Sequence, residues 1–315
     1  MSDACNRAAA EAEGVRFVAW TRAPSRAARG RHYDPYQDWA APTPFAGIIA
    51  AFEGQFTGPA LAFAQDVQAE LAREPADLVV ACEMLFGVQL GCEAMGQPMA
   101  LLAVNIALFP GPGVPPLGPG LMPARTPQEA AEQEALRATL TAALDGATLP
   151  HFNEARAALG LRPLATLADQ HKAGCALLLA TARAFDFAPD PLPQGLKYVG
   201  PILAEPAWAQ PWSSPFPADD ERPLLLTAFS TTFQNHAGAV QRVIEAQTRL
   251  PVRGVVTLGG SLEPADLLGA ANVALLPSAP HGAVMREAQV VVTHGGHGTV
   301  MKALAAGRPP AGRCC

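Results

Sequence analysis

Short runs of hydrophobic residues recur along the whole chain, each bounded by turn-forming residues and separated by segments with helical periodicity. In the first part they predict strands at 15–20, 78–85 and 99–104, and 45–73 has the pattern of an amphipathic helix. Continuous apolar runs are typical of parallel strands covered on both faces. The pattern therefore predicts an α/β fold.

An alanine-rich segment at 126–145 predicts a long helix. Thr126 is a favourable N-cap, Pro127 suits the first helical position, and acidic residues follow in the first turn.

A change of composition divides the chain in two. Residues 205–223 concentrate proline, tryptophan and acidic residues without any period, which indicates a linker between a first domain, 1–204, and a second domain, 224–315. The second domain has a helical pattern at 238–248 and a short helical turn at 264–268. Its strands are predicted at 224–229, 252–258, 273–276 and 290–293.

Charge and composition limit the classes of partner. Of the 315 residues 50% are hydrophobic and 16% charged, the net charge is -6, and no run of Lys or Arg occurs. This excludes a nucleic-acid or anionic-membrane footprint and favours small-molecule partners. No apolar run has the roughly 18 residues needed to insert into a bilayer.

The polar N-terminus lacks the apolar core of a signal peptide. The six cysteines have no metal-type spacing, and Cys82 and Cys92 lie in apolar segments, so no metal is expected and a reducing, cytoplasmic location is predicted.

The segment 290–309 carries the clearest chemistry: a strand runs into a glycine-rich turn and then directly into a helix. Gly295, Gly296 and Gly298 let the backbone approach a ligand, Thr299 is expected to cap the helix, and the unpaired N–H groups of the first turn favour an anion. His294 stands at the strand end, where side chains of open α/β sheets meet ligands. The alternative is a tight turn with no ligand.

The whole string VVVTHGGHGTVMKALAAGRP resembles the nucleotide-sugar signature of glycosyltransferases with the GT-B fold, particularly the bacterial macrolide and antibiotic branch and the plant secondary-product enzymes. The resemblance implies two Rossmann-like domains. It also implies that the donor diphosphate is bound by His294, Gly296, Gly298 and Thr299.

Two further segments of the second domain are similar to this family. Ser230 and Thr231 follow its first strand like the family's hydroxyl-rich loop that touches the donor phosphates, although such clusters are also ordinary caps. Ala279 and His281 lie in the loop before the signature, where the family holds the nucleotide base with backbone groups.

In the first domain, 78–83 resembles the strand that ends in the aspartate orienting the catalytic histidine. Here that position is Glu83, and a solvent-exposed glutamate after a strand is the alternative. The proline-rich loop 110–119 resembles the family's acceptor-side loops, or is a connector.

The resemblance also implies that both domains are incomplete. The family's catalytic histidine precedes the segment with which this sequence starts, so the chain is expected to be an inactive fragment. After the last helix we expect no strand, and the exposed apolar edge predicts poor stability or a homodimer.

The implied function is inverting transfer of a sugar from a UDP- or TDP-sugar to a hydroxyl of a small, lipophilic acceptor, with the nucleotide sugar as co-substrate and no metal or other cofactor. The alternatives are a nucleotide-sugar epimerase on the same fold and a non-catalytic donor-binding protein. An NAD-dependent dehydrogenase is disfavoured because no acidic residue follows the glycine-rich turn.

Overall fold

The computed structural model describes residues 1–28, 30–33, 38–205 and 211–312. The chain forms two compact units. Unit 1 comprises Met1, 19–25 and 40–202, and unit 2 comprises 2–18, 26–39 and 203–315.

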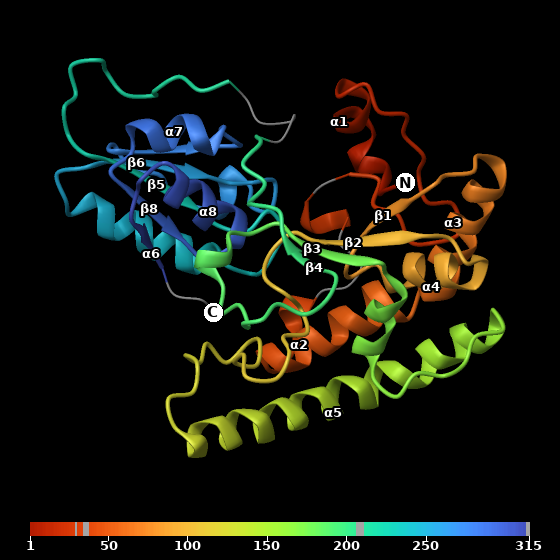
Figure 1. Cartoon of the computed structure of the whole chain (residues 1–315). Coiled ribbons are helices and arrows are strands. Elements are labelled where there is room, and N and C mark those ends of the chain that lie inside the picture. Colours follow the sequence, from red (N-terminus) through yellow and green to blue (C-terminus); the bar gives the residue numbers. More distant parts are fainter. Residues whose placement is uncertain (29, 34–37, 206–210, 313–315) are drawn as a thin grey trace. The chain divides into compact units, whose positions relative to one another are not determined.

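Unit 1 is built on a four-stranded parallel sheet in the order β1-β2-β3-β4 (Figure 1). These strands are β1 (Val79–Cys82), β2 (Met99–Ala103), β3 (Ala176–Leu179) and β4 (Leu196–Tyr198). The α-helices of the unit are α2 (Pro44–Ala51), α3 (Ala60–Arg73), α4 (Phe86–Met95) and α5 (Pro127–Ala158). Shorter helical segments are η4 (Phe52–Thr57), η5 (Leu167–Ala173) and η6 (Arg183–Phe185).

Glycines allow helices α3 and α4 of unit 1 to pack in close contact. A Cβ atom at Gly87 would lie 2.4 Å from the carbonyl oxygen of Ala60, and one at Gly91 would lie 2.5 Å from Val67. These helices form a buried core with the strands and with Trp20. The ring of Trp20 meets that of Phe63 edge-on, with the ring centroids 4.9 Å apart.

The helices predicted for unit 1 are confirmed, with different bounds. The helical pattern of 45–73 forms α2, the π-helical η4 and α3, and Gly58 and Pro59 separate the last two. Thr126 caps α5 by accepting the N–H of Glu129 at 3.1 Å, but α5 continues through Pro150 well beyond the predicted end.

The strand predicted at 15–20 is wrong. Neither sheet contains these residues, and Val15 is 58% exposed. Only Trp20 reaches a hydrophobic core, and without a neighbouring strand the backbone groups of this segment lack the ladder that stabilises a strand.

Unit 2 contains a five-stranded parallel sheet in the order β7-β6-β5-β8-β9. Its strands are β5 (Leu224–Ala228), β6 (Arg253–Thr257), β7 (Val273–Leu276), β8 (Val290–Thr293) and β9 (Pro310–Ala311). Its helices include α6 (Ala237–Thr248), α7 (His281–Glu287), α8 (His297–Ala305) and η7 (Pro264–Asp266). Figure 1 shows α6 on one face of the sheet and α7 on the other. This is the strand order of half a doubly wound fold.

Short elements lie at both ends of the described chain. The N-terminal residues form η1 (Ala4–Asn6), α1 (Arg7–Ala12), η2 (Arg31–Tyr33) and η3 (Asp38–Ala40). The expectation of no strand after the last helix is wrong, because Pro310 and Ala311 pair in parallel with Val291 and Val292 of β8.

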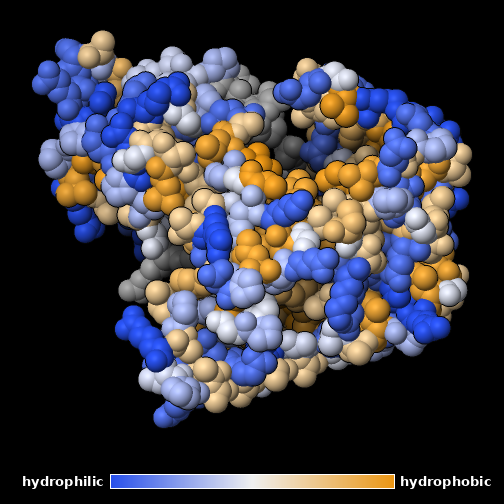
Figure 2. All heavy atoms as spheres, viewed as in Figure 1, coloured by the Kyte–Doolittle hydropathy of each residue, from blue (hydrophilic) through white to orange (hydrophobic). Residues whose placement is uncertain are grey.

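On the face seen in Figure 2, hydrophobic and hydrophilic residues are interspersed. No helix in the described ranges combines the length and hydrophobicity needed to cross a membrane.

Candidate functional site

The strand order of the unit 2 sheet reverses between β5 and β8, which are neighbours in the sheet although α6, β6, η7, β7 and α7 separate them in sequence. In doubly wound sheets this switch point opens a crevice at the carboxyl ends of the strands, where ligands bind. The loop after β5 holds Ser230 and Thr231, and the loop after β8 holds His294 and Gly296. The fold therefore brings the predicted phosphate-binding segments to one edge.

The turn after β8 needs its glycines. Gly295 has a positive φ of 92°, a conformation that side chains disfavour, and Gly296 is the N-cap of α8. The predicted capping role of Thr299 is wrong: α8 begins at His297, so Thr299 lies in its first turn, and no side chain caps the helix. The first-turn N–H groups are left for solvent or an anion.

His294 is held directly over this turn. A Cβ atom at Gly296 would lie 2.8 Å from both Cε1 and Nε2 of the imidazole, so only glycine leaves room for the ring. The ring packs at 5.8 Å against Phe229, and its buried Nδ1 has no hydrogen-bond partner within the described part of the chain. Burial lowers the pKa of His294, which favours the neutral imidazole.

The hydroxyl-rich loop is folded on itself. Ser230 Oγ accepts the N–H of Thr232 at 3.1 Å and lies 2.9 Å from its hydroxyl, while the carbonyl of Ser230 accepts a hydrogen bond from Ser261 at 2.7 Å. Thr231 is exposed. These contacts fix the loop and leave Thr231 accessible.

Of the two residues predicted to lie in the loop before the signature, Ala279 lies in the loop between β7 and α7, whereas His281 is the first residue of α7. Ala279 is buried in the core of unit 2 and offers only backbone groups. Nε2 of His281 lies 3.1 Å from the hydroxyl of Thr257, and burial lowers the pKa of this histidine.

Glu205 is a residue of this region that the sequence did not indicate. Its carboxylate accepts the N–H groups of His281 (3.2 Å) and Gly282 (2.6 Å) and pairs with Lys302 at 2.8 Å. Burial alone would raise the pKa of Glu205, but the hydrogen bonds from Lys302 and Gly282 outweigh it and lower the pKa. Sequence placed Glu205 in the linker, and only its partners reveal that it ties α7 to α8.

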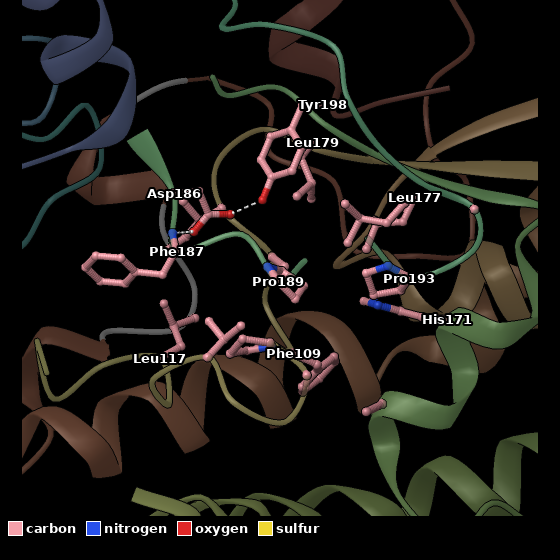
Figure 3. Close-up of a pocket in the computed structure, with 18 of the residues that line it drawn as sticks. Phe109, Leu117, His171, Leu177, Leu179, Asp186, Phe187, Pro189, Pro193 and Tyr198 are labelled. Atoms are coloured by element: carbon pink, nitrogen blue, oxygen red, sulfur yellow. Dashed lines mark hydrogen bonds between the residues drawn. The ribbon is translucent and has the colours of Figure 1, made fainter. Parts of the chain in front are cut away.

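Unit 1 contains a cavity of about 610 Å³ (Figure 3). Its wall comes from three segments, 106–121, 168–179 and 186–198, which include the proline-rich loop predicted to lie on the acceptor side. The wall is largely apolar, with Phe109, Leu177 and Phe187 among its residues. At one edge the hydroxyl of Tyr198 donates to Asp186 at 2.7 Å.

His171 is a polar group of this cavity that the sequence left without a role. Its imidazole stacks on Phe86 with ring centroids 5.6 Å apart and lies 5.2 Å from Phe109. Nε2 lies 3.0 Å from the carbonyl oxygen of Glu83. Burial lowers the pKa of His171, so the ring is neutral near pH 7.

Glu83 is 3% exposed, so the alternative of a solvent-exposed glutamate is wrong. Burial raises the pKa of its carboxyl to about 7, although the N–H of Leu108 donates a hydrogen bond to it. Its Oε2 atom is buried without a partner in the described residues. His171 contacts the main-chain oxygen of Glu83 and not this Oε2 atom.

No group of three or more His, Cys, Asp or Glu side chains among the described residues is arranged to hold a metal ion.

Two comparisons place the chain among known proteins. It is 28% identical over 285 residues to 4'-demethylrebeccamycin synthase of Lentzea aerocolonigenes, a match that covers 88% of this chain and 66% of that protein. The chain therefore spans just under two thirds of the length of this relative. No family profile matches the chain.

Among solved structures, the glycotransferase of kitacinnamycin superposes with a TM-score of 0.68 at 17% identity, covering 98% of this chain and 70% of that one. The chain has the fold of the GT-B glycosyltransferases. The glycosyltransferase SsfS6 of Streptomyces sp. SF2575, complexed with thymidine diphosphate, matches with a TM-score of 0.54 at 17% identity and covers 94% and 68% of the two chains. The resemblance to antibiotic glycosyltransferases is confirmed.

Proposed function

We propose that this chain binds a nucleoside-diphosphate sugar, UDP- or TDP-linked, in unit 2, and that its parent activity is inverting transfer of the sugar to a hydroxyl of a lipophilic acceptor. The observation that carries the proposal is the packing of His294 over Gly296 at the switch point of the sheet.

Three kinds of hydrogen-bonding group would hold the diphosphate of the nucleotide sugar. The first-turn N–H groups of α8 point to the crevice, Thr299 lies in that turn, and Thr231 is exposed on the neighbouring loop, with Ser230 and Gly298 completing the set. His294 would donate from its imidazole to a phosphate oxygen. These groups stabilise the negative charge that develops on the departing diphosphate. Ala279 and His281 would contact the base from the start of α7.

The acceptor would bind in the cavity of unit 1. A volume of about 610 Å³ suits a ligand of several fused rings, and an apolar wall favours a lipophilic one. In the transfer, a base takes the hydroxyl proton as the acceptor oxygen attacks the anomeric carbon, and the bond to the diphosphate oxygen breaks with its electron pair.

One observation favours a second candidate, donor binding without turnover. The resemblance pairs the carboxyl of Glu83 with a catalytic histidine, whereas in the described structure Oε2 of Glu83 has no partner.

The test is calorimetric titration with TDP and with UDP, together with a transfer assay using a TDP-sugar and a hydroxylated aromatic acceptor. His294→Ala is expected to weaken diphosphate binding about tenfold or more. His32→Ala, at an exposed histidine of the same unit, is the matched control. Binding with transfer supports the enzyme, and binding without transfer supports the second candidate. If neither nucleotide binds, both are wrong.

A further inference from the structure

The cavity of unit 1 contains a histidine, His171, whose ring orientation and hydrogen-bonding role are both fixed by its neighbours. We propose that His171 accepts a hydrogen bond from a hydroxyl or N–H group of an aromatic ligand in this cavity, and so selects acceptors that carry such a donor. This inference rests on the proposed function for the identity of the ligand as an acceptor.

The protonation of the two ring nitrogens follows from the contact of His171 with Glu83. A main-chain carbonyl can only accept, so Nε2, at 3.0 Å from that oxygen, carries the hydrogen. In the neutral ring Nδ1 is then left with a lone pair. Nδ1 makes no hydrogen bond with any described residue and is not sealed from solvent. It can therefore only accept.

The orientation of the ring is set by contacts from distant parts of the chain. Phe86, at the start of α4, is nearly parallel to the imidazole, with an interplanar angle of 14°, and Phe109 closes a second side at 60°. Two aromatic neighbours and one hydrogen bond leave the ring little freedom. Figure 3 shows His171 reaching from η5 toward the interior of the cavity, near Pro193.

The other polar side chains labelled in Figure 3 are already hydrogen-bonded within the chain. The Tyr198 hydroxyl is engaged by Asp186 at 2.7 Å, and Asp186 also accepts the N–H of Phe187 at 2.8 Å. The cavity wall is largely apolar and includes Leu177, Pro193 and Phe109, the last of which contacts the ring of His171. In such surroundings a ligand without a donor opposite Nδ1 would leave that nitrogen desolvated and unpaired, which disfavours its binding.

The experiment compares two planar probes of which one can donate a hydrogen bond and the other, its methyl ether, cannot. Fluorescence titrations of the full chain with 1-hydroxypyrene and 1-methoxypyrene are expected to give a preference of about fivefold for the hydroxyl compound. His171→Phe keeps the ring stack and should remove the preference. His171→Gln, which keeps one donor and one acceptor, should restore part of it, and His32→Phe should leave it unchanged.

A second variant shows that the probes occupy the cavity. Leu117→Trp adds bulk to the cavity wall and is expected to weaken both probes equally, without changing their ratio. Equal affinity of the two probes for the wild-type chain overturns the proposal, and so does a preference that persists in His171→Phe. TDP titration of the same protein reports on unit 2 separately, so a failure of the donor site is distinguishable from a failure of His171.

Discussion

The candidate donor site of unit 2 and the cavity of unit 1 are built in different ways. The candidate donor site consists of two loops that directly follow strands β5 and β8, and within each loop its glycines, hydroxyls or helix N–H groups are close together in sequence. The cavity wall comes from three segments spread over 106–198, and one of its polar side chains, His171, is oriented by Phe86, Phe109 and Glu83.

The comparison teaches that a site built from short loops at strand ends can be recognised in a sequence. A site built from side chains of several distant elements cannot. Carboxylates with long-range partners follow the second pattern in both units. Asp66, Glu83 and Glu205 each take their environment from distant residues, and the predictions below test that difference.

The largest effect is expected at Asp66, which lies 2% exposed on α3. It accepts the main-chain N–H groups of Thr21, Arg22 and Ala23 and the hydroxyl of Thr21. Asp66→Ala should lower the free energy of unfolding by about 3–5 kcal/mol in urea titrations, because it leaves these donors without an acceptor.

The pH dependence of the free energy of unfolding provides a second test of Asp66. Burial alone would raise its pKa, but the hydrogen bonds outweigh it and lower the pKa below 3.8. The contribution of Asp66 to stability is therefore present above pH 3.8, and it is lost as the pH falls through the lowered pKa of the folded state. A wild-type chain and an Asp66→Asn variant with parallel stability curves from pH 6 to pH 2 would contradict this assignment.

Next in size is Glu205. Glu205→Ala should destabilise unit 2 by about 2–3 kcal/mol, since it leaves Lys302, only 12% exposed, without its partner and frees two N–H groups of α7. Glu11→Ala is the control, because its pair with Arg7 is exposed and should be worth less than about 0.5 kcal/mol. Similar denaturation midpoints for the two variants would show that Glu205 is merely a linker residue.

The third test bears on the donor site itself. Gly296→Ala places a methyl group 2.8 Å from the His294 ring, which must move, so TDP affinity in calorimetry should fall about tenfold. Gly238→Ala is the matched control, since its Cβ would meet only the end of Arg242 at 3.8 Å. An unchanged affinity in Gly296→Ala would mean that the turn does not position His294 for the diphosphate.

The smallest effect concerns Glu83. Its pKa is raised from 4.5 to about 7, so folding favours the protonated form, and its contribution to stability is lost as pH rises through about 7. Glu83→Gln should therefore be more stable than wild type by about 1 kcal/mol at pH 8 and show no gain at pH 5. Thermal unfolding at both pH values measures this, with the exposed Glu13→Gln as control. An equal difference at the two pH values would rule out a buried, neutral Glu83.

The sequence by itself determined the fold class, strands β5 to β8 of unit 2 and the glycine turn before α8. These features depend on local physics: continuous apolar runs, residues that tolerate a positive φ at Gly295, and a Thr-Pro start for α5 capped by Thr126. The resemblance of 290–309 to the family's signature could be recognised for the same reason, because the residues that carry it are close together in sequence.

Only the tertiary structure decided the rest. Residues 15–20 have the composition of a strand but no neighbouring strand with which to pair, and Thr299 lost the capping role because α8 starts two residues earlier, at His297. His171 and Glu205 carry no local signal at all. Their roles come from packing and hydrogen bonds across 62 to 97 residues of sequence, with Phe109 for the first and Lys302 for the second. Such contacts exist only once the chain has folded.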